Sequence, residues 1–282
     1  MKIFNTVHEL QHYLYPFTKS RIVGFVPTMG ALHQGHLSLV ELSNNICDIT
    51  VVSIYVNPAQ FNDPQDFNKY PRTIETDLNH LDNNDVDVVF LPQTEEIYPV
   101  GFNPDYSNLD LGFLCQTMES KHRPGHFDGV IKVVDRLINI VRPDKMILGR
   151  KDYQQFLIVK NFVNQLQYPT EVVSSEIVRE KDGLAMSSRN VRLSENDRDL
   201  ALGLSRSLNY INEHSGTRSF NELRAIVIEK FLTNPIIRLE YLDLAEAVDL
   251  SPAMDFGGTD KIVCIAAYIG EVRLIDNILV KV

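Results

Sequence analysis

The stretch IVGFVPTMGALHQGH, residues 22–36, combines a short apolar run with a loop that holds two glycines and two histidines. Residues 22–26 have the length and the β-branched and aromatic content of a buried strand. Residues 37–44 follow with apolar side chains at helical spacing. The stretch therefore predicts a strand, a tight glycine-containing loop and a helix, the unit from which open parallel sheets are built.

The same alternation repeats along the first part of the chain. Apolar runs are typical of strands where they are short and bounded by proline, glycine or asparagine, and of helices where their period is near 3.6. Strands are expected at 49–56, 86–91, 145–148 and 171–173, and helices at 73–83, 127–141 and 153–165. Strands that alternate with helices predict an α/β fold with a parallel sheet.

The pattern changes after about residue 176. Two helices, 194–213 and 220–232, are followed by three strand-like runs at 238–244, 262–268 and 272–282. Ser194 with Asp197 suits a helix N-terminus. We therefore expect two domains: a nucleotide- and substrate-binding domain at 1–176, and a smaller α+β domain at 177–282 that carries the loop around Ser187.

Composition narrows the function classes. The 282 residues are 44% hydrophobic and 23% charged, and the formal net charge is −10. An acidic chain disfavours general binding to nucleic acid. Neither a signal peptide nor a membrane-spanning run is predicted, and three scattered cysteines predict no disulfide framework or zinc motif, so we expect a cytoplasmic protein.

The loop at 27–36 is a candidate anion site. Gly30 and Gly35 permit close backbone approach, and His36 opens the predicted helix, whose N-terminus attracts anions. His33 and His36 are then candidate phosphate donors. The alternative is a pair of loop histidines that only cap a turn. A zinc site is disfavoured because His-x-x-His lacks further ligands at a metalloprotease spacing.

Two further segments offer positive charge and hydroxyl groups. Residues 182–190, DGLAMSSRN, place two serines beside Arg189, which is suited to grip a polyphosphate, although such serines also cap local turns. Residues 149–155, GRKDYQQ, follow a predicted strand, and Lys151 is a candidate phosphate ligand. The alternative there is a solvated pair of Lys151 with Asp152 at a helix start.

Two glutamines suit the binding of a reactive carboxylate. Gln60 lies in the segment 56–61 at the end of the predicted second strand, and Gln155 lies in the segment just described. Amide donors orient a carboxylate without the strong charge neutralisation that an arginine fork imposes. The turn-rich segment 123–129, RPGHFDG, is either a phosphate-side loop or an ordinary helix entry.

These motifs resemble, in order and over the whole chain, the pantothenate synthetase (pantoate–β-alanine ligase) family of the HxGH nucleotidyltransferase superfamily. The loop 27–36 is similar to the HxGH signature, and 186–190 is similar to the family's version of the KMSKS loop. The other similar segments are 56–61, 70–73, 123–127, 151–155 and 274–277.

The resemblance implies a Rossmann-like first domain, a smaller second domain that closes over ATP, a homodimer and Mg²⁺. It implies that pantoate and ATP form pantoyl-adenylate and pyrophosphate, and that β-alanine then yields pantothenate and AMP. It also implies site residues. His33, His36, Lys151 and Arg189 are catalytic; Met29, Gly35, His36, Gly149, Lys151, Asp152, Met186, Ser187, Ser188 and Arg189 bind ATP; Gln60 and Gln155 bind pantoate; Asp77 contacts the metal.

Two rival functions share these features. One is another nucleotidyltransferase that transfers AMP to a phosphate ester, which the pocket around Gln60 and Gln155 would distinguish. The other is a nucleotide-binding protein without turnover. A protein without turnover is disfavoured because His33, His36, Lys151 and the 187–189 segment are all present together.

Overall fold

The computed structural model describes residues 1–17 and 20–281 and divides into two compact units. The first unit contains residues 1–111, 124–150 and 158–176, and the second contains 112–123, 151–157 and 177–282. Two short segments of the predicted first domain therefore belong to the second unit. The functional division at 1–176 and 177–282 stays a prediction.

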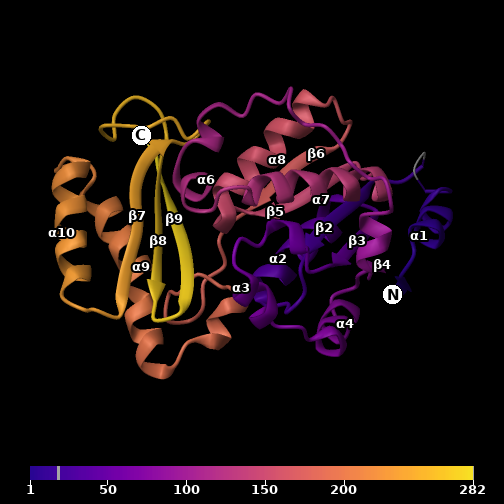
Figure 1. Cartoon of the computed structure of the whole chain (residues 1–282), viewed down its shortest axis with the longest axis horizontal. Coiled ribbons are helices and arrows are strands. Elements are labelled where there is room, and N and C mark those ends of the chain that lie inside the picture. The colour runs from indigo at the N-terminus through magenta and orange to yellow at the C-terminus, as the bar shows by residue number, and fades with distance from the viewer. Residues whose placement is uncertain (18–19, 282) are drawn as a thin grey trace. The chain divides into compact units, whose positions relative to one another are not determined.

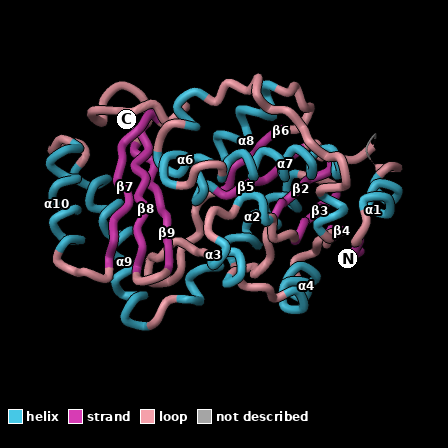
Figure 2. The backbone as a smooth tube through the Cα atoms, viewed as in Figure 1, coloured by secondary structure: helices cyan, strands magenta, loops and turns pink. Residues whose placement is uncertain are grey.

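A six-stranded parallel sheet organises the first unit (Figures 1 and 2). Its order is β1-β4-β3-β2-β5-β6, and every pair of neighbouring strands is parallel. The predicted α/β class, with a Rossmann-like parallel sheet, is confirmed. The strands are β1 (Lys2–Phe4), β2 (Val23–Thr28), β3 (Ile49–Ile54), β4 (Val88–Phe90), β5 (Lys145–Gly149) and β6 (Glu171–Ser175).

Both faces of this sheet are covered. On one face, Val26, Val52 and Val89 join a buried cluster with residues of the helices α2 (Gln34–Ile46) and α4 (Ile74–Asp82). The intervening residues Phe25 and Val51 are also fully buried. Burial on both faces explains why these strands are continuous apolar runs without alternation.

The helices of the first unit connect these strands. They are α1 (Val7–Leu14), α2 (Gln34–Ile46), η1 (Pro58–Gln60), α3 (Pro64–Lys69), α4 (Ile74–Asp82), α5 (Thr94–Ile97), α7 (His126–Val141), η3 (Arg150–Asp152), which crosses into the second unit, and α8 (Tyr153–Gln165), which begins there. β1 and α3 were not predicted because three and six residues carry too little pattern, and α1 was not predicted although Val7, Leu10 and Leu14 have helical spacing.

β2 runs two residues beyond the expected end at Val26. The Thr28 hydroxyl donates to the Ser53 carbonyl at 2.7 Å, and the Tyr55 N–H donates to the Thr28 carbonyl at 3.0 Å. These bonds continue the pairing of β2 with β3. Proline removes one donor without ending the strand, because its neighbours retain theirs.

The order of strands changes direction between β2 and β5. From β2 the chain passes through α2 to β3 on one side, and β5 pairs with the opposite side of β2. At such a switch point the loops that follow two adjacent strands diverge, and ligands of open α/β sheets bind there. The loop after β2 is 29–33, and the segment after β5 begins at Arg150.

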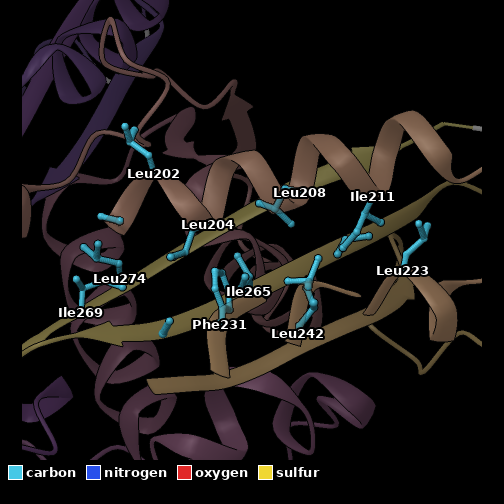
Figure 3. Packing of buried hydrophobic residues seen from close by; sticks show 14 of the residues in the cluster. Leu202, Leu204, Leu208, Ile211, Leu223, Phe231, Leu242, Ile265, Ile269 and Leu274 are labelled. Carbon is cyan, nitrogen blue, oxygen red and sulfur yellow. The ribbon is translucent and has the colours of Figure 1, made fainter. Parts of the chain in front are cut away.

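The second unit has an antiparallel sheet with order β7-β8-β9, formed by β7 (Ile237–Glu246), β8 (Lys261–Ile269) and β9 (Val272–Val280). α9 (Glu195–His214) and α10 (Phe220–Leu232) pack on one face, and Figure 3 shows Leu204, Leu208 and Ile211 of α9 directed at this sheet. The smaller α+β arrangement agrees with the sequence. Ser194 caps α9, as predicted, and Ser219 forms a capping box at α10. The end of the run predicted at 272–282 includes Val282, which lies outside the described residues.

The opposite face of this sheet holds the segments 112–123 and 151–157. Arg273 donates two bonds to the Glu119 carboxylate, and the Tyr153 hydroxyl donates to the Ala247 carbonyl at 2.9 Å. Glu119 belongs to α6 (Met118–His122), which follows η2 (Gly112–Cys115). The remaining element of this unit is η4 (Ser188–Arg192). Among the described helices, none is long and apolar enough to span a membrane.

Candidate active site

The loop after β2 is held by a buried carboxylate. Asp77 of α4 is 1% exposed, and its two oxygens accept the backbone N–H groups of Ala31 at 2.9 Å and Leu32 at 2.8 Å. The Thr73 hydroxyl donates to the same carboxylate at 3.1 Å. Ala31 has φ of +50°, a left-handed conformation that costs a residue with a Cβ about 1–2 kcal/mol. Asp77 therefore stabilises a strained loop.

His33 and His36 bond reciprocally at the start of α2. Nδ1 of His33 accepts the Gly35 N–H at 3.1 Å, and Nδ1 of His36 accepts the His33 N–H at 3.3 Å. Their ring centroids are 4.1 Å apart. A ring nitrogen that accepts a hydrogen bond carries no proton, so a neutral ring bears its proton on Nε2. The alternative role of the two histidines, capping the turn, therefore also fixes an Nε2–H donor on each ring at the N-terminus of α2.

The Gln60 amide is oriented by Asn57. Asn57 is 1% exposed, and its Nδ2 donates to Gln60 Oε1 at 2.9 Å and to the Gly129 carbonyl at 3.2 Å. The Tyr98 hydroxyl donates to Asn57 Oδ1 at 2.7 Å. With its oxygen engaged, Gln60 presents its Nε2 donors on the other side, 3.4 Å from the Met29 sulfur. Met29 of the loop after β2 and Gln60 of η1, both predicted site residues, are therefore in contact.

Close packing fixes the backbone that carries Gln60. A Cβ built on Gly129 of α7 would lie 2.2 Å from the Ala59 carbonyl oxygen and 2.7 Å from the Gln60 nitrogen. Nδ1 of His126 donates to the Gln60 carbonyl at 2.7 Å. The segment 123–129 therefore enters α7 and also supports η1. Gly125, at φ of +79°, forms the turn that starts the helix.

In the second unit, Lys151 is the candidate phosphate ligand nearest the end of β5. Its Nζ lies 3.2 Å from Asp152 Oδ2, and the two side chains are 20% and 45% exposed. The charged pair foreseen as an alternative is thus present. Its partial exposure is compatible with an exchange of partners when an anion binds.

Gln154, the neighbour of the predicted Gln155, has a different position. It is 4% exposed, its Nε2 donates to the Leu114 and Thr117 carbonyls at 2.6 and 3.0 Å, and its Oε1 accepts the Glu119 N–H at 2.9 Å. Gln154 therefore anchors the segment 112–123. Gln155 is half-buried and points elsewhere, because adjacent positions of a helix occupy different faces.

The loop that carries the two serines is a short hairpin that leads into η4. The Met186 N–H donates to the Val178 carbonyl at 3.0 Å, and Asn190 donates to the Ala185 carbonyl at 3.0 Å. Ser187 accepts the Arg189 N–H at 3.3 Å, so one of the serines caps a turn. Ser188 is buried and Arg189 is half-buried.

Positive charges gather in the same unit. Burial lowers the pKa of Arg123, Glu119 opposes this, and the nearby charges of Arg273 and Arg189 lower it further. Arg123 and Arg273 are both paired with Glu119, and Arg273 is also paired with Glu240. The sequence identified Arg189 and the segment of Arg123 but gave no sign of Glu119 and Arg273, which are far apart in the chain.

Several functional contacts were not foreseen. Asn57 and Tyr98 had no assigned role, although Asn57 lies in the quoted motif 56–61. The family resemblance implied that Asp77 contacts a metal. Both of its oxygens already accept N–H groups, which favours a loop-holding role over a contact with Mg²⁺. That contact stays a prediction, and no group of three or more His, Cys, Asp or Glu side chains suited to a metal occurs among residues 1–17 and 20–281.

Comparison with known proteins shows the family of this chain. A family model described as pantoate–β-alanine ligase matches residues 2–279. The chain belongs to the pantoate–β-alanine ligase family. It is 42% identical over 280 residues to a pantothenate synthetase of Porphyromonas gingivalis, with 99% of each chain covered. A Bacteroides fragilis relative is 41% identical over 283 residues, covering 100% of this chain and 99% of its own.

Solved structures of this family share the fold. Pantothenate synthetase from Thermus thermophilus superposes with a TM-score of 0.93 at 41% identity, covering 100% of both chains. Pantoate–β-alanine ligase from Francisella tularensis, described as complexed with beta-gamma ATP and β-alanine, gives a TM-score of 0.80 at 32% identity, covering 99% of this chain and 97% of its own. The family resemblance noted in the sequence is therefore confirmed.

Proposed function

We propose that this chain condenses pantoate with β-alanine in an ATP-dependent reaction through pantoyl-adenylate. A pantoate carboxylate oxygen bonds to the α-phosphorus of ATP, and the bond from that phosphorus to the bridging oxygen breaks to release pyrophosphate. The β-alanine amine then bonds to the acyl carbon, the acyl–phosphate bond breaks, and AMP leaves. The amine proton is released to solvent or to AMP.

One observation carries the proposal. The Nδ1 atoms of His33 and His36 accept backbone N–H groups at 3.1 and 3.3 Å, at the N-terminus of α2 and beside the sheet's switch point. Two Nε2–H donors and the helix terminus then favour the negative charge that develops as pyrophosphate leaves. Because the carboxylate is already ionised, the first step requires alignment and charge stabilisation and no base.

Each residue predicted to bind ATP or pantoate has a role in this scheme. His33, His36, Lys151 and Arg189 stabilise phosphate charge. Met29, Gly35, Gly149, Asp152, Met186, Ser187 and Ser188 complete the contacts with ATP. Gln60 and Gln155 hold pantoate; Gln60 does so with the Nε2 donors that Asn57 leaves directed away from itself.

The proposal includes Mg²⁺, a homodimer and a cytoplasmic enzyme. Mg²⁺ bound to ATP would neutralise phosphate charge, and phosphate oxygens and water commonly supply most of its ligands. The absence of a carboxylate cluster in the described ranges suits that mode. Three free thiols suit a reducing compartment.

The test measures pyrophosphate, AMP and pantothenate in the same samples. Pantoate-dependent pyrophosphate that becomes catalytic turnover only with β-alanine supports both half-reactions. No pantoate-dependent release, from folded protein that binds ATP, would contradict the proposed acid. A phosphate-ester acceptor would then be tested, since the rival transferases share the histidine loop.

A further inference from the structure

β9 carries two adjacent buried polar side chains. Asp276 and Asn277 are 4% and 5% exposed, and they interrupt a strand whose other buried residues are apolar. Adjacent residues of a strand face opposite sides of the sheet. A buried polar residue requires partners, so each of the two must be bonded on its own face.

Asp276 is bound to the hairpin that leads to the serine loop. The Arg179 Nη1 and Nη2 atoms donate to its two oxygens at 2.6 and 3.0 Å. Arg179 Nη1 also donates to the Gly183 carbonyl at 3.2 Å, and Arg179 pairs with Ala185 across the hairpin. One guanidinium thus connects β9 to both sides of the hairpin just before Ser187.

Asn277 is bound to the backbone at Lys151. Its Nδ2 donates to the Lys151 carbonyl at 2.9 Å, and its own N–H donates to Asp276 Oδ1 at 2.8 Å. The second bond couples the two residues. The backbone of Lys151 on one face and the hairpin before Ser187 on the other are therefore fixed to consecutive residues of one strand.

We propose that Asp276 and Asn277 are positioning residues that set the distance between the Lys151 ammonium and the 187–189 loop, so that both grip the phosphates of one ATP. The inference rests on the proposed function, because it takes these two segments as phosphate ligands. Neither residue is assigned a contact with substrate. The physical basis is preorganisation: misplacement of a charge-stabilising group by about 1 Å costs up to 10²-fold in rate.

Two variants test the bonds that Asn277 and Asp276 make on the two faces of β9. Asn277→Leu keeps the branching at Cγ but cannot donate to the Lys151 carbonyl. Asp276→Asn keeps the shape and weakens the fork to Arg179. We expect each to raise the KM for ATP about ten-fold, because the two segments then no longer hold the phosphates together; this stays within the 10²-fold loss that a displaced group can cause in kcat/KM. The KM values for pantoate and β-alanine should change less, within about two-fold of the parent's, because neither substrate carries a phosphate for Lys151 or the 187–189 loop to bind.

Ile278→Val is the matched control. It lies on the same strand and shortens a side chain packed against the apolar cluster, without touching either polar bond. It should lower the melting temperature and leave the KM for ATP unchanged. If Asp276→Asn does not fold, Arg179→Lys tests the same bond from a side chain that is 28% exposed.

Lys151→Ala and Ser187→Ala distinguish a failure of the phosphate-site assignment from a failure of the positioning role. If these variants keep the parent's ATP kinetics, the phosphate-site assignment is wrong, and the positioning role is overturned with it. If they are defective while folded Asn277→Leu and Asp276→Asn are not, only the positioning role is overturned. Equal defects for ATP, pantoate and β-alanine would indicate general support of the fold and would also overturn it.

Discussion

Nδ2 of Asn57 donates to Oε1 of Gln60 at 2.9 Å, and this bond decides which end of the Gln60 amide faces the proposed acid. In Asn57→Asp the oxygen that receives the Tyr98 and Ala59 donors is preserved, but the donor to Gln60 is lost. Two oxygens would then face each other, so the Gln60 amide should rotate and present its oxygen to pantoate.

We expect Asn57→Asp to lower kcat/KM for pantoate about 10²-fold, comparable to the loss of one charge-stabilising donor. The KM for ATP should change little. Tyr98→Phe, which keeps Asn57 Nδ2 in place, is the control and should have a smaller effect. An Asn57→Asp protein that folds and retains the parent's pantoate kinetics would refute the orienting role.

The two nitrogens of His36 can be tested separately. Asparagine places an acceptor where Nδ1 lies, so His36→Asn should keep the bond to the His33 N–H and lose the Nε2 donor. We expect normal unfolding but a loss of about 10²–10³ in kcat. Steady-state kinetics and thermal melts of the same preparations provide the measurement.

His36→Gln is the complementary change, since its amide reaches the Nε2 position and not the cap. It should recover part of the rate and melt at a lower temperature. The reverse ranking, with His36→Asn more active than His36→Gln, would show that the cap matters and the phosphate donor does not. Lys151→Ala should match His36→Asn in rate loss, as another group that acts on phosphate charge.

Two roles are considered for Asp77, holding the histidine loop and contacting Mg²⁺. The dependence of the rate on Mg²⁺ concentration distinguishes them. Asp77→Asn retains one acceptor for two backbone N–H groups, which leaves either Ala31 or Leu32 unsatisfied. An unpaired buried donor costs about 1–3 kcal/mol, so the free energy of unfolding should fall by that amount without any ligand. The kcat should fall as well, because the histidine loop is then less fixed.

Higher Mg²⁺ concentrations should not restore the Asp77→Asn rate. Recovery at high Mg²⁺, together with an unfolding free energy equal to the parent's, would instead favour the metal contact that the resemblance implied. Asp82→Asn is a suitable control, because Asp82 lies on the same helix and its side chain is 67% exposed.

The elements that periodicity revealed are those with long apolar faces. β2, α2, α7 and the two capped helices of the second unit were predicted close to their observed bounds. α3 and α6 were not, since six and five residues respectively carry too little pattern to define a period. The assignment of 112–123 to the second unit was also beyond the sequence, because it depends on Glu119 meeting Arg273, 154 residues away.

The residues of the candidate site also divide into those that the sequence revealed and those that it did not. Residues proposed to act through their own side-chain chemistry, such as His33 and Lys151, were recognised as motifs. Asn57, Asp276 and Asn277 act by orienting other groups, and their effect depends on partners that only the fold brings near. A motif shows that such residues recur together, but it does not show which atom each one holds.

Glu119 provides a prediction for the stability of the second unit against pH. Burial alone would raise the pKa of this carboxyl, but hydrogen bonds and the charge of Arg273, helped by Arg123 and Tyr241, lower it to about 2 from an ordinary value of 4.5. A group with a lower pKa in the folded state stabilises the fold fully above its unfolded value. That contribution, about 3 kcal/mol, is lost as the pH falls from about 4.5 towards 2.

Urea unfolding followed by circular dichroism at a series of pH values from about 7 to about 3 should therefore show falling stability below about pH 4.5. Glu119→Gln should be less stable at neutral pH, because breaking a buried pair costs about 3–5 kcal/mol, reduced here since Arg273 keeps Glu240. Its stability should also depend less on pH in the acid range. If the parent and Glu119→Gln lose stability in parallel on acidification, other carboxylates cause the acid sensitivity, and Glu119 is not the group that links protonation to the second unit.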